Sequence, residues 1–243
     1  MKIGIFGDSF ACNNPLLHAK FVGEELAAEK KSWIDHIEAE KNTRVANHAV
    51  RGSSLYYSYS QFKKYQRTYD KIIFIVTDWG RLWVKNISTI HPHIPGFAHC
   101  EVKLKDADIE DSDDREILQA AYDYYVYLEN HEREIDFHKL MINEILRVRS
   151  DVLLIPAFPN ELSSLVPTWS GPCLKDISDI DCHFFKVPSD GQDLKHCHFN
   201  NENNLIFAKQ IINWIDHQTP LHIDLRDYQA PTKSLEYYYK IKI

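Results

Sequence analysis

The run Ile-Ile-Phe-Ile-Val at residues 72–76 constrains the fold of this chain more than any other feature of its sequence. Consecutive apolar residues of this kind are typical of a strand that is buried on both faces, since a strand with one face in water alternates apolar and polar side chains. Such strands occur in parallel sheets that helices cover on both sides. The run therefore predicts an α/β protein.

Further segments fit this architecture when they are read for hydrophobic periodicity. Strands are predicted at residues 2–6, 44–49 and 151–156, and a fifth at residues 183–187. Helices are predicted at residues 23–41, 53–69, 115–149 and 201–217. Because the strands alternate with helices, we predict a three-layer α/β/α sandwich with a flavodoxin-like parallel sheet of about five strands.

The 243 residues are enough for one large α/β domain. We assign this domain to residues 1–217, with loop insertions at about 80–114 and 157–182, and we assign residues 218–243 to a C-terminal tail or an extra edge strand. Loops of this length in a compact domain usually act as lids or binding loops, so both insertions are candidate parts of a functional site.

Charge and cysteine content narrow the classes of partner and compartment. A net charge of -7 leaves no excess of Lys and Arg to replace phosphate counterions, so we expect neither a nucleic-acid partner nor a membrane surface. Five scattered cysteines are an odd number, which favours a reducing compartment. Because we find no signal-peptide core and no apolar stretch of membrane-spanning length, we expect a cytoplasmic protein. A homo-oligomer is compatible with the sequence.

The first candidate for chemistry is Ser9 in the tripeptide Gly7-Asp8-Ser9. This tripeptide directly follows the first predicted strand, so it lies at the carboxyl end of a parallel sheet, where open α/β sheets form their sites. Gly7 permits a tight turn, and a serine at the start of a helix keeps its backbone N–H free for an oxyanion. The alternative is an ordinary Asp or Ser helix cap.

The second candidate is His198, which precedes the last predicted helix. A histidine at this position can fold over the carboxyl edge of the sheet toward Ser9. A hydroxyl nucleophile requires such a general base, so the two residues together predict a nucleophilic site. The alternative for a single histidine is an ordinary surface position.

Three short segments resemble sequence blocks of the SGNH/GDSL hydrolase superfamily. Gly7-Asp8-Ser9-Phe10 resembles the first block, and residues 51–54, Arg-Gly-Ser-Ser, resemble the glycine block. His198-Phe199-Asn200, with Ala208 ten residues after the histidine, resembles the last block. The resemblance covers residues 2–217 and implies a serine esterase without a cofactor. It also implies Ser9 as nucleophile, His198 as base, and an oxyanion hole formed by the N–H groups of Ser9 and Gly52.

One departure from the family concerns the third oxyanion donor. The family has Gly-x-Asn-Asp after the third strand, whereas this chain reads Thr77-Asp78-Trp79-Gly80-Arg81. In this respect the chain is similar to divergent, often phage-encoded relatives, so the resemblance implies that Thr77 or Arg81 takes over part of the role of the Asn. The alternative is that Thr77 caps the turn and Arg81 pairs with a nearby acidic side chain.

A second departure concerns the acid that orients the base. The family has Asp three residues before the catalytic His, and Lys195 stands at that position when His198 is the base. Asp193 lies five residues before His198 and three before His196, so two registers compete. We prefer His198 with Asp193 as the third member, because Asn200 then falls in its family position. A Ser-His dyad is the alternative.

Other constellations carry less weight. Histidines and cysteines cluster at residues 91–100 and 182–198, but neither cluster has the paired spacing of a structural zinc site, so we predict no metal. Trp79, Trp83 and Trp169 lie in or beside the long loops and are suited to stacking on sugar rings, with core packing as the alternative.

The resemblance thus implies hydrolysis of a carboxylic ester through an acyl-enzyme. Substrates of the family range from acetylated sugars to lipids and thioesters, and the loop tryptophans favour O-deacetylation of a carbohydrate. Two alternatives stay open. One is a noncatalytic carbohydrate-binding or phage structural module on the same fold, and the other is an O-acyltransferase in which a sugar hydroxyl replaces water.

Overall fold

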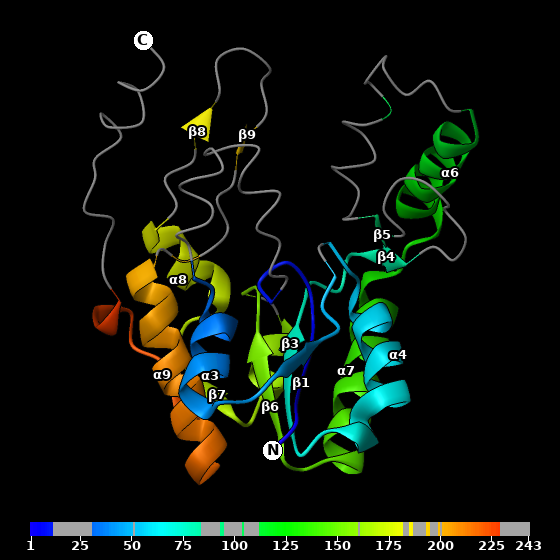
Figure 1. Ribbon diagram of the computed structural model, residues 1–243. Coiled ribbons are helices and arrows are strands. Elements are labelled where there is room, and N and C mark those ends of the chain that lie inside the picture. The colour runs from blue at the N-terminus through cyan, green and yellow to red at the C-terminus, as the bar shows by residue number, and fades with distance from the viewer. Residues whose placement is uncertain are drawn as a thin grey trace.

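The computed structural model contains a parallel sheet of four strands between two layers of helices (Figure 1). The structure describes residues 1–11, 31–50, 52–83, 93–94, 104, 112–159, 161–181, 185–186, 193–194, 199 and 201–228. The strands of the main sheet are β1 (Ile3–Phe6), β2 (Val45–Asn47), β3 (Lys71–Val76) and β6 (Val152–Pro156), in the order β2-β1-β3-β6. All three pairings are parallel, so the predicted fold class is confirmed.

Helices cover both faces of this sheet (Figure 1). On one face lie α3 (Trp33–Lys41) and α9 (Asn201–His217), and on the other lie α4 (Leu55–Tyr65) and α7 (His131–Val148). The remaining helices are α6 (Ser112–Asp123), a π-helical turn at Tyr124–Leu128, α8 (Leu174–Asp181), and 3-10 helices at Gln66–Thr68, Glu161–Leu165 and Leu225–Asp227. No helix among the described residues is both long and apolar enough to cross a membrane.

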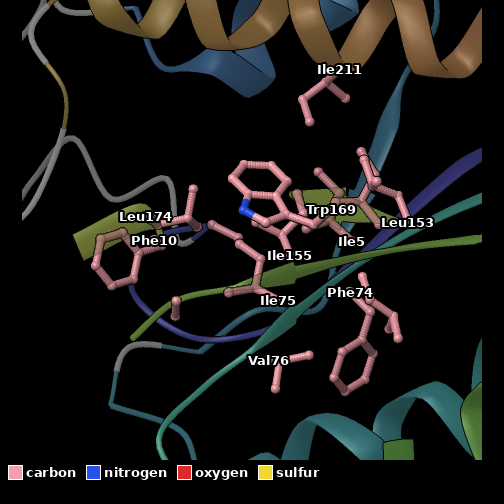
Figure 2. Packing of buried hydrophobic residues seen from close by; sticks show 14 of the residues in the cluster. Ile5, Phe10, Phe74, Ile75, Val76, Leu153, Ile155, Trp169, Leu174 and Ile211 are labelled. Atoms are coloured by element: carbon pink, nitrogen blue, oxygen red, sulfur yellow. The ribbon is translucent and has the colours of Figure 1, made fainter. Parts of the chain in front are cut away.

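The apolar run of β3 is buried on both faces, as its composition predicts. Side chains alternate along a strand, so Phe74 and Val76 point toward α4 while Ile75 points toward α9, where Ile211 lies (Figure 2). Phe74 and Ile75 are both fully buried. Trp169 packs into the same core on the α9 side (Figure 2), so core packing is the alternative that holds for this tryptophan.

Among the described residues, three pairs of very short strands lie outside the main sheet. β7 (Trp169–Ser170) pairs with β10 (Leu221–His222), β4 (Leu82–Trp83) with β5 (His93–Ile94), and β8 (Phe185–Lys186) with β9 (Asp193–Leu194). The predicted fifth strand at residues 183–187 therefore contributes to an antiparallel pair with β9 and not to the main sheet. A partner so close in sequence costs little loop-closure entropy, which favours this local pairing.

The segment 115–149, predicted as a long helical stretch with room for a bend, is divided at Asn130. α6 passes into the π-helical turn, whose end is marked by the Glu129 N–H donating to the Tyr124 carbonyl oxygen at 2.8 Å. α7 then begins anew, because the Asn130 side chain accepts the Arg133 N–H at 2.9 Å and so caps the helix.

The segment 157–182, predicted as a loop, contains the helix α8. Its start is fixed by Asp176, whose carboxylate accepts the backbone N–H of Cys173 at 2.9 Å and the Cys173 thiol at 3.0 Å. Burial raises the pKa of this thiol to about 12, so Cys173 is a structural residue. The prolines in this segment favoured the prediction of a loop, so hydrophobic periodicity did not indicate this short helix.

Candidate active site

The carboxyl ends of the four parallel strands meet at one edge of the sheet. Open α/β sheets form their ligand sites at this edge. The turns that follow β1, β2 and β3 hold four of the predicted site residues: Ser9, Gly52, Thr77 and Arg81.

Ser9 is half-buried in a tight turn that directly follows β1. The Asp8 carbonyl oxygen accepts the Ala11 N–H at 3.1 Å, and the Asp8 carboxylate Oδ1 accepts the Phe10 N–H at 3.1 Å. Asp8 therefore bridges over Ser9 and fixes the turn. Within the described residues, neither the hydroxyl nor the backbone N–H of Ser9 has a hydrogen-bond partner.

Gly7 begins this turn at a position where only glycine fits. Its φ is 151°, and a Cβ added there would lie 2.6 Å from the Cβ of Ile75 on the neighbouring strand β3. The backbone of β1 therefore lies close to β3 just before Ser9, and this close approach explains why the tripeptide begins with glycine.

Gly52 forms the turn after β2 with a φ of 72°, in the left-handed region that favours glycine. The Ser53 N–H donates to the Val50 carbonyl oxygen at 3.0 Å and closes this turn. The Gly7 carbonyl oxygen accepts both the Val50 N–H at 3.1 Å and the Ser53 hydroxyl at 2.8 Å. These two bonds join the Gly52 turn to the Ser9 turn. The Gly52 N–H has no acceptor among the described residues.

The Asp8 carboxylate is the centre of a buried polar cluster. It is fully buried, and its Oδ2 accepts the Thr77 hydroxyl at 2.6 Å and Nη1 of Arg81 at 2.9 Å. The same Nη1 donates to the Ser53 carbonyl oxygen at 3.4 Å. The Arg81 guanidinium carbon also lies 4.9 Å from the centre of the Phe158 ring, in the segment after β6. The cluster therefore links the turns that follow all four strands.

Thr77 and Arg81 thus lie beside the Ser9 turn, but both contact Asp8. The Thr77 hydroxyl has one proton to donate and gives it to the carboxylate. Arg81 forms an ion pair with Asp8. The structure thus shows the alternative given for Arg81, which was pairing with an acidic side chain.

A chain of hydrogen bonds connects the flank of Ser9 with the flank of His198. The Phe10 carbonyl oxygen accepts Nε1–H of Trp33 at 3.0 Å, and the Trp33 backbone N–H donates to Oδ1 of Asn204 at 2.9 Å. Nδ2 of Asn204 then donates to the Phe199 carbonyl oxygen at 2.8 Å. Trp33, Asn204 and Phe199 are all buried, so the chain is shielded from water.

Three other predicted residues are described in part or not at all. His198 and His196 lie outside the described residues. Asp193 lies in β9, where its backbone pairs with Lys186, but its side chain is outside the description. The His and Cys clusters at residues 91–100 and 182–198 fall largely outside as well. Within the described ranges, no group of three or more such side chains is arranged to hold a metal ion.

The loop after β3 is held from the other side by the segment between α6 and α7. The Tyr125 hydroxyl donates to the Gly80 carbonyl oxygen at 2.8 Å, and the Trp79 ring lies edge-on to His131 with ring centres 4.2 Å apart. Burial, reinforced by the neighbouring Glu134, raises the pKa of Glu129 at the end of this segment. The loop that carries Arg81 is therefore clamped between the sheet and α7.

Helix α7 also carries a buried histidine. His138 on α7 is 4 % exposed, and its Nδ1 lies 2.5 Å from the Glu134 carbonyl oxygen. Burial lowers the pKa of His138, and the hydrogen bond to the Glu134 carbonyl oxygen, together with the nearby carboxylates, offsets only part of this effect, so the neutral form is favoured.

The comparisons with known proteins include a distant structural neighbour. The sequence matches no family model and no curated protein. A solved structure from Desulfitobacterium hafniense DCB-2, assigned by its description to the G-D-S-L family of lipolytic proteins, is similar at 11% sequence identity and a TM-score of 0.25. The match covers 67% of this chain and 82% of that chain.

Sequence reasoning missed the residues that hold this site together. Asp8 was visible only as part of the tripeptide, for which helix capping was the alternative. Trp33 and Asn204 gave no signal beyond an apolar or polar position on a predicted helix. A hydrogen bond that spans 171 residues, as between Trp33 and Asn204, leaves no local pattern in a single sequence.

Proposed function

We propose that this chain is a serine hydrolase of carboxylic esters, related to the SGNH/GDSL hydrolases. Ser9 is the nucleophile, His198 the general base, and Asp193 the acid that orients the base. The observation that carries the proposal is the hydrogen-bond chain from Phe10 to Phe199, because it ties together the residues next to Ser9 and His198. A nucleophile needs its base within hydrogen-bond reach.

The oxyanion hole of this enzyme consists of the backbone N–H groups of Ser9 and Gly52. The Gly7 carbonyl oxygen supports this assignment, since its bonds to Val50 and Ser53 hold the two turns against each other. Preorganised donors of this kind stabilise the charge that develops on the acyl oxygen, and each is worth about 3 to 4 kcal/mol in the transition state.

The reaction follows from these roles. The Ser9 Oγ attacks the acyl carbon while His198 takes the hydroxyl proton, and the acyl oxygen becomes an oxyanion held by the two N–H groups. The C–O bond of the ester then breaks, and His198 gives the proton to the leaving alcohol. Water attacks the acyl-enzyme in a second round of the same steps and releases the acid, so no cofactor is consumed.

The substrate class that we propose is an O-acetylated carbohydrate. Exposed aromatic rings next to the site support it: the Tyr56 ring, 42% exposed, lies 5.6 Å from the ring of Trp83. Tyr56 lies in the first turn of α4, close behind the Gly52 turn, and Trp83 follows Arg81 by two residues. Aromatic faces in such a position suit the apolar face of a sugar ring.

Labelling with a fluorophosphonate tests the proposed function. We expect the probe to form one covalent adduct, located on Ser9 by peptide mass spectrometry, because the activated hydroxyl attacks phosphorus as it attacks an ester. Absence of labelling, together with no release of acetate from acetylated sugars, would favour the noncatalytic module. An added alcohol acceptor that captures the acyl group would favour the acyltransferase.

Substitution of the two histidines tests the assignment of the base. We expect His198→Ala to reduce turnover of an aryl acetate by at least about 10³-fold, because members of one catalytic unit lose activity together. His196→Ala serves as the matched control and is expected to stay within about threefold of the wild type. Initial rates of the purified variants measure both effects, and the reverse ranking would move the base to His196 with Asp193 three residues before it.

A further inference from the structure

We propose that Asp8 is the positioning residue of the Ser9 turn, and that Thr77 and Arg81 influence catalysis through the Asp8 carboxylate and not by contact with substrate. The inference rests on the proposed function, because it assigns roles to the residues around Ser9. It gives Thr77 and Arg81 a different task from that of the family Asn whose place they take.

The two oxygens of Asp8 serve different parts of the site. Oδ1 accepts the Phe10 N–H at 3.1 Å, so it holds the backbone on the far side of Ser9. Oδ2 accepts Thr77 Oγ1 at 2.6 Å and Arg81 Nη1 at 2.9 Å. A displacement of the carboxylate therefore displaces the turn that aims the hydroxyl and N–H of Ser9.

The position of this carboxylate depends on Arg81. Asp8 is fully buried, and an unpaired buried carboxylate is so costly that it must move toward water or take up a proton. The Arg81 guanidinium, 12% exposed, supplies the compensating charge. Its Nη1 also reaches the Ser53 carbonyl oxygen at 3.4 Å, so one group holds both turns of the proposed oxyanion hole.

Direct contact of Thr77 with the oxyanion conflicts with this geometry. Thr77 is fully buried, and its single hydroxyl proton is donated to Asp8. A hydroxyl has one proton, so the group has no second donor for a substrate oxygen. The Asp8 carboxylate thus accepts hydrogen bonds from the Thr77 hydroxyl, the Arg81 guanidinium and the Phe10 N–H.

A double-mutant cycle between Asp8 and Arg81 tests the inference. Met is an unbranched apolar side chain that replaces the stem of Arg and removes the charged group that lies over Phe158. We expect Arg81→Met to lower kcat for an aryl acetate by at least about tenfold with KM within about twofold, because the loss lies in positioning and not in substrate binding. Asp8→Asn removes the buried charge but keeps an oxygen for the Phe10 N–H. The double variant should therefore recover kcat to within about threefold of Asp8→Asn alone, since partners in one network are not additive.

Direct contact of Arg81 with substrate predicts a different result. KM would then rise in Arg81→Met and remain raised in the double variant, and this outcome would overturn the inference. Arg147→Met, which removes an arginine from the exposed ion pair with Glu144, is the matched control and should leave both parameters unchanged. If Arg81→Met does not fold, the KM of the double variant, compared with that of the wild type, decides alone, because neither of these two proteins leaves a charge unpaired at this site.

Hydrogen exchange separates this inference from the proposed function. A wild type that neither hydrolyses esters nor reacts with the fluorophosphonate would refute the esterase proposal. The Phe10 amide would still report on Asp8: we expect slow exchange in the wild type, at least about tenfold faster exchange in Arg81→Met, and slow exchange again in the double variant. An unchanged exchange rate in folded Arg81→Met would show that Arg81 does not hold the carboxylate.

Discussion

Ser9→Ala is expected to reduce the hydrolysis of a short aryl acetate by at least about 10³-fold, because the variant lacks the oxygen that forms the acyl-enzyme in the proposed mechanism. The fold should remain intact, with a free energy of unfolding within about 1 kcal/mol of the wild type, since Ser9 is half-buried and its hydroxyl makes no bond within the described residues. Initial rates and urea unfolding of the same preparation measure the two quantities.

A matched control for this result is Ser60→Ala on α4. The Ser60 hydroxyl donates to the Tyr57 carbonyl oxygen within its own helix at 2.7 Å, so its removal should leave the rate unchanged. Equal turnover by Ser9→Ala and the wild type would remove Ser9 from the mechanism, whatever the effect on stability.

Gly7→Ala is expected to have a large effect on stability, with a loss of about 3 kcal/mol in the free energy of unfolding. Two costs combine: the φ of 151° is rarely adopted by a residue with a side chain, and the new Cβ would lie 2.6 Å from the Cβ of Ile75. Relief of this contact must shift the Ser9 turn, so we also expect a loss of esterase activity. Urea unfolding monitored by tryptophan fluorescence measures the change in stability.

Gly80→Ala, in the turn after the neighbouring strand β3, provides the control at the same edge of the sheet. A Cβ at Gly80 would meet only the Asp78 side chain, at 4.0 Å, so its free energy of unfolding should change by less than about 1 kcal/mol. A loss at Gly7 no greater than the loss at Gly80 would contradict the close approach of β1 to β3.

The parts of the fold that were predictable are those with a local signal. The apolar run of β3 and the alternation of strands and helices led to the parallel sheet, and the last helix begins and ends at the residues that its periodicity indicated. Ser9 and Gly52 could be placed at the carboxyl edge of the sheet because each follows a predicted strand. Periodicity and strand order are properties of neighbouring residues, and a single sequence displays them.

The parts that were not predictable depend on partners far apart in the chain. Asp8 and Arg81 are 73 residues apart, and nothing near either residue distinguishes a buried ion pair from an exposed charge. Such contacts form only once the sheet is assembled, so a prediction made segment by segment cannot include them. The pairing of β8 with β9 escaped prediction for a different reason, because two residues in each strand are too few to display a hydrophobic period.

The bond between Trp33 and Asn204 has a consequence for biosynthesis. It joins α3, which is synthesised early, with α9, which is synthesised late, and the two residues are 171 positions apart. A chain that is still emerging from the ribosome therefore lacks this hydrogen bond until α9 is complete. Contacts of such long range form late in folding, since they carry the greatest loop-closure cost. An unfinished chain is therefore expected to be inert, and activity should mark completion of the last helix.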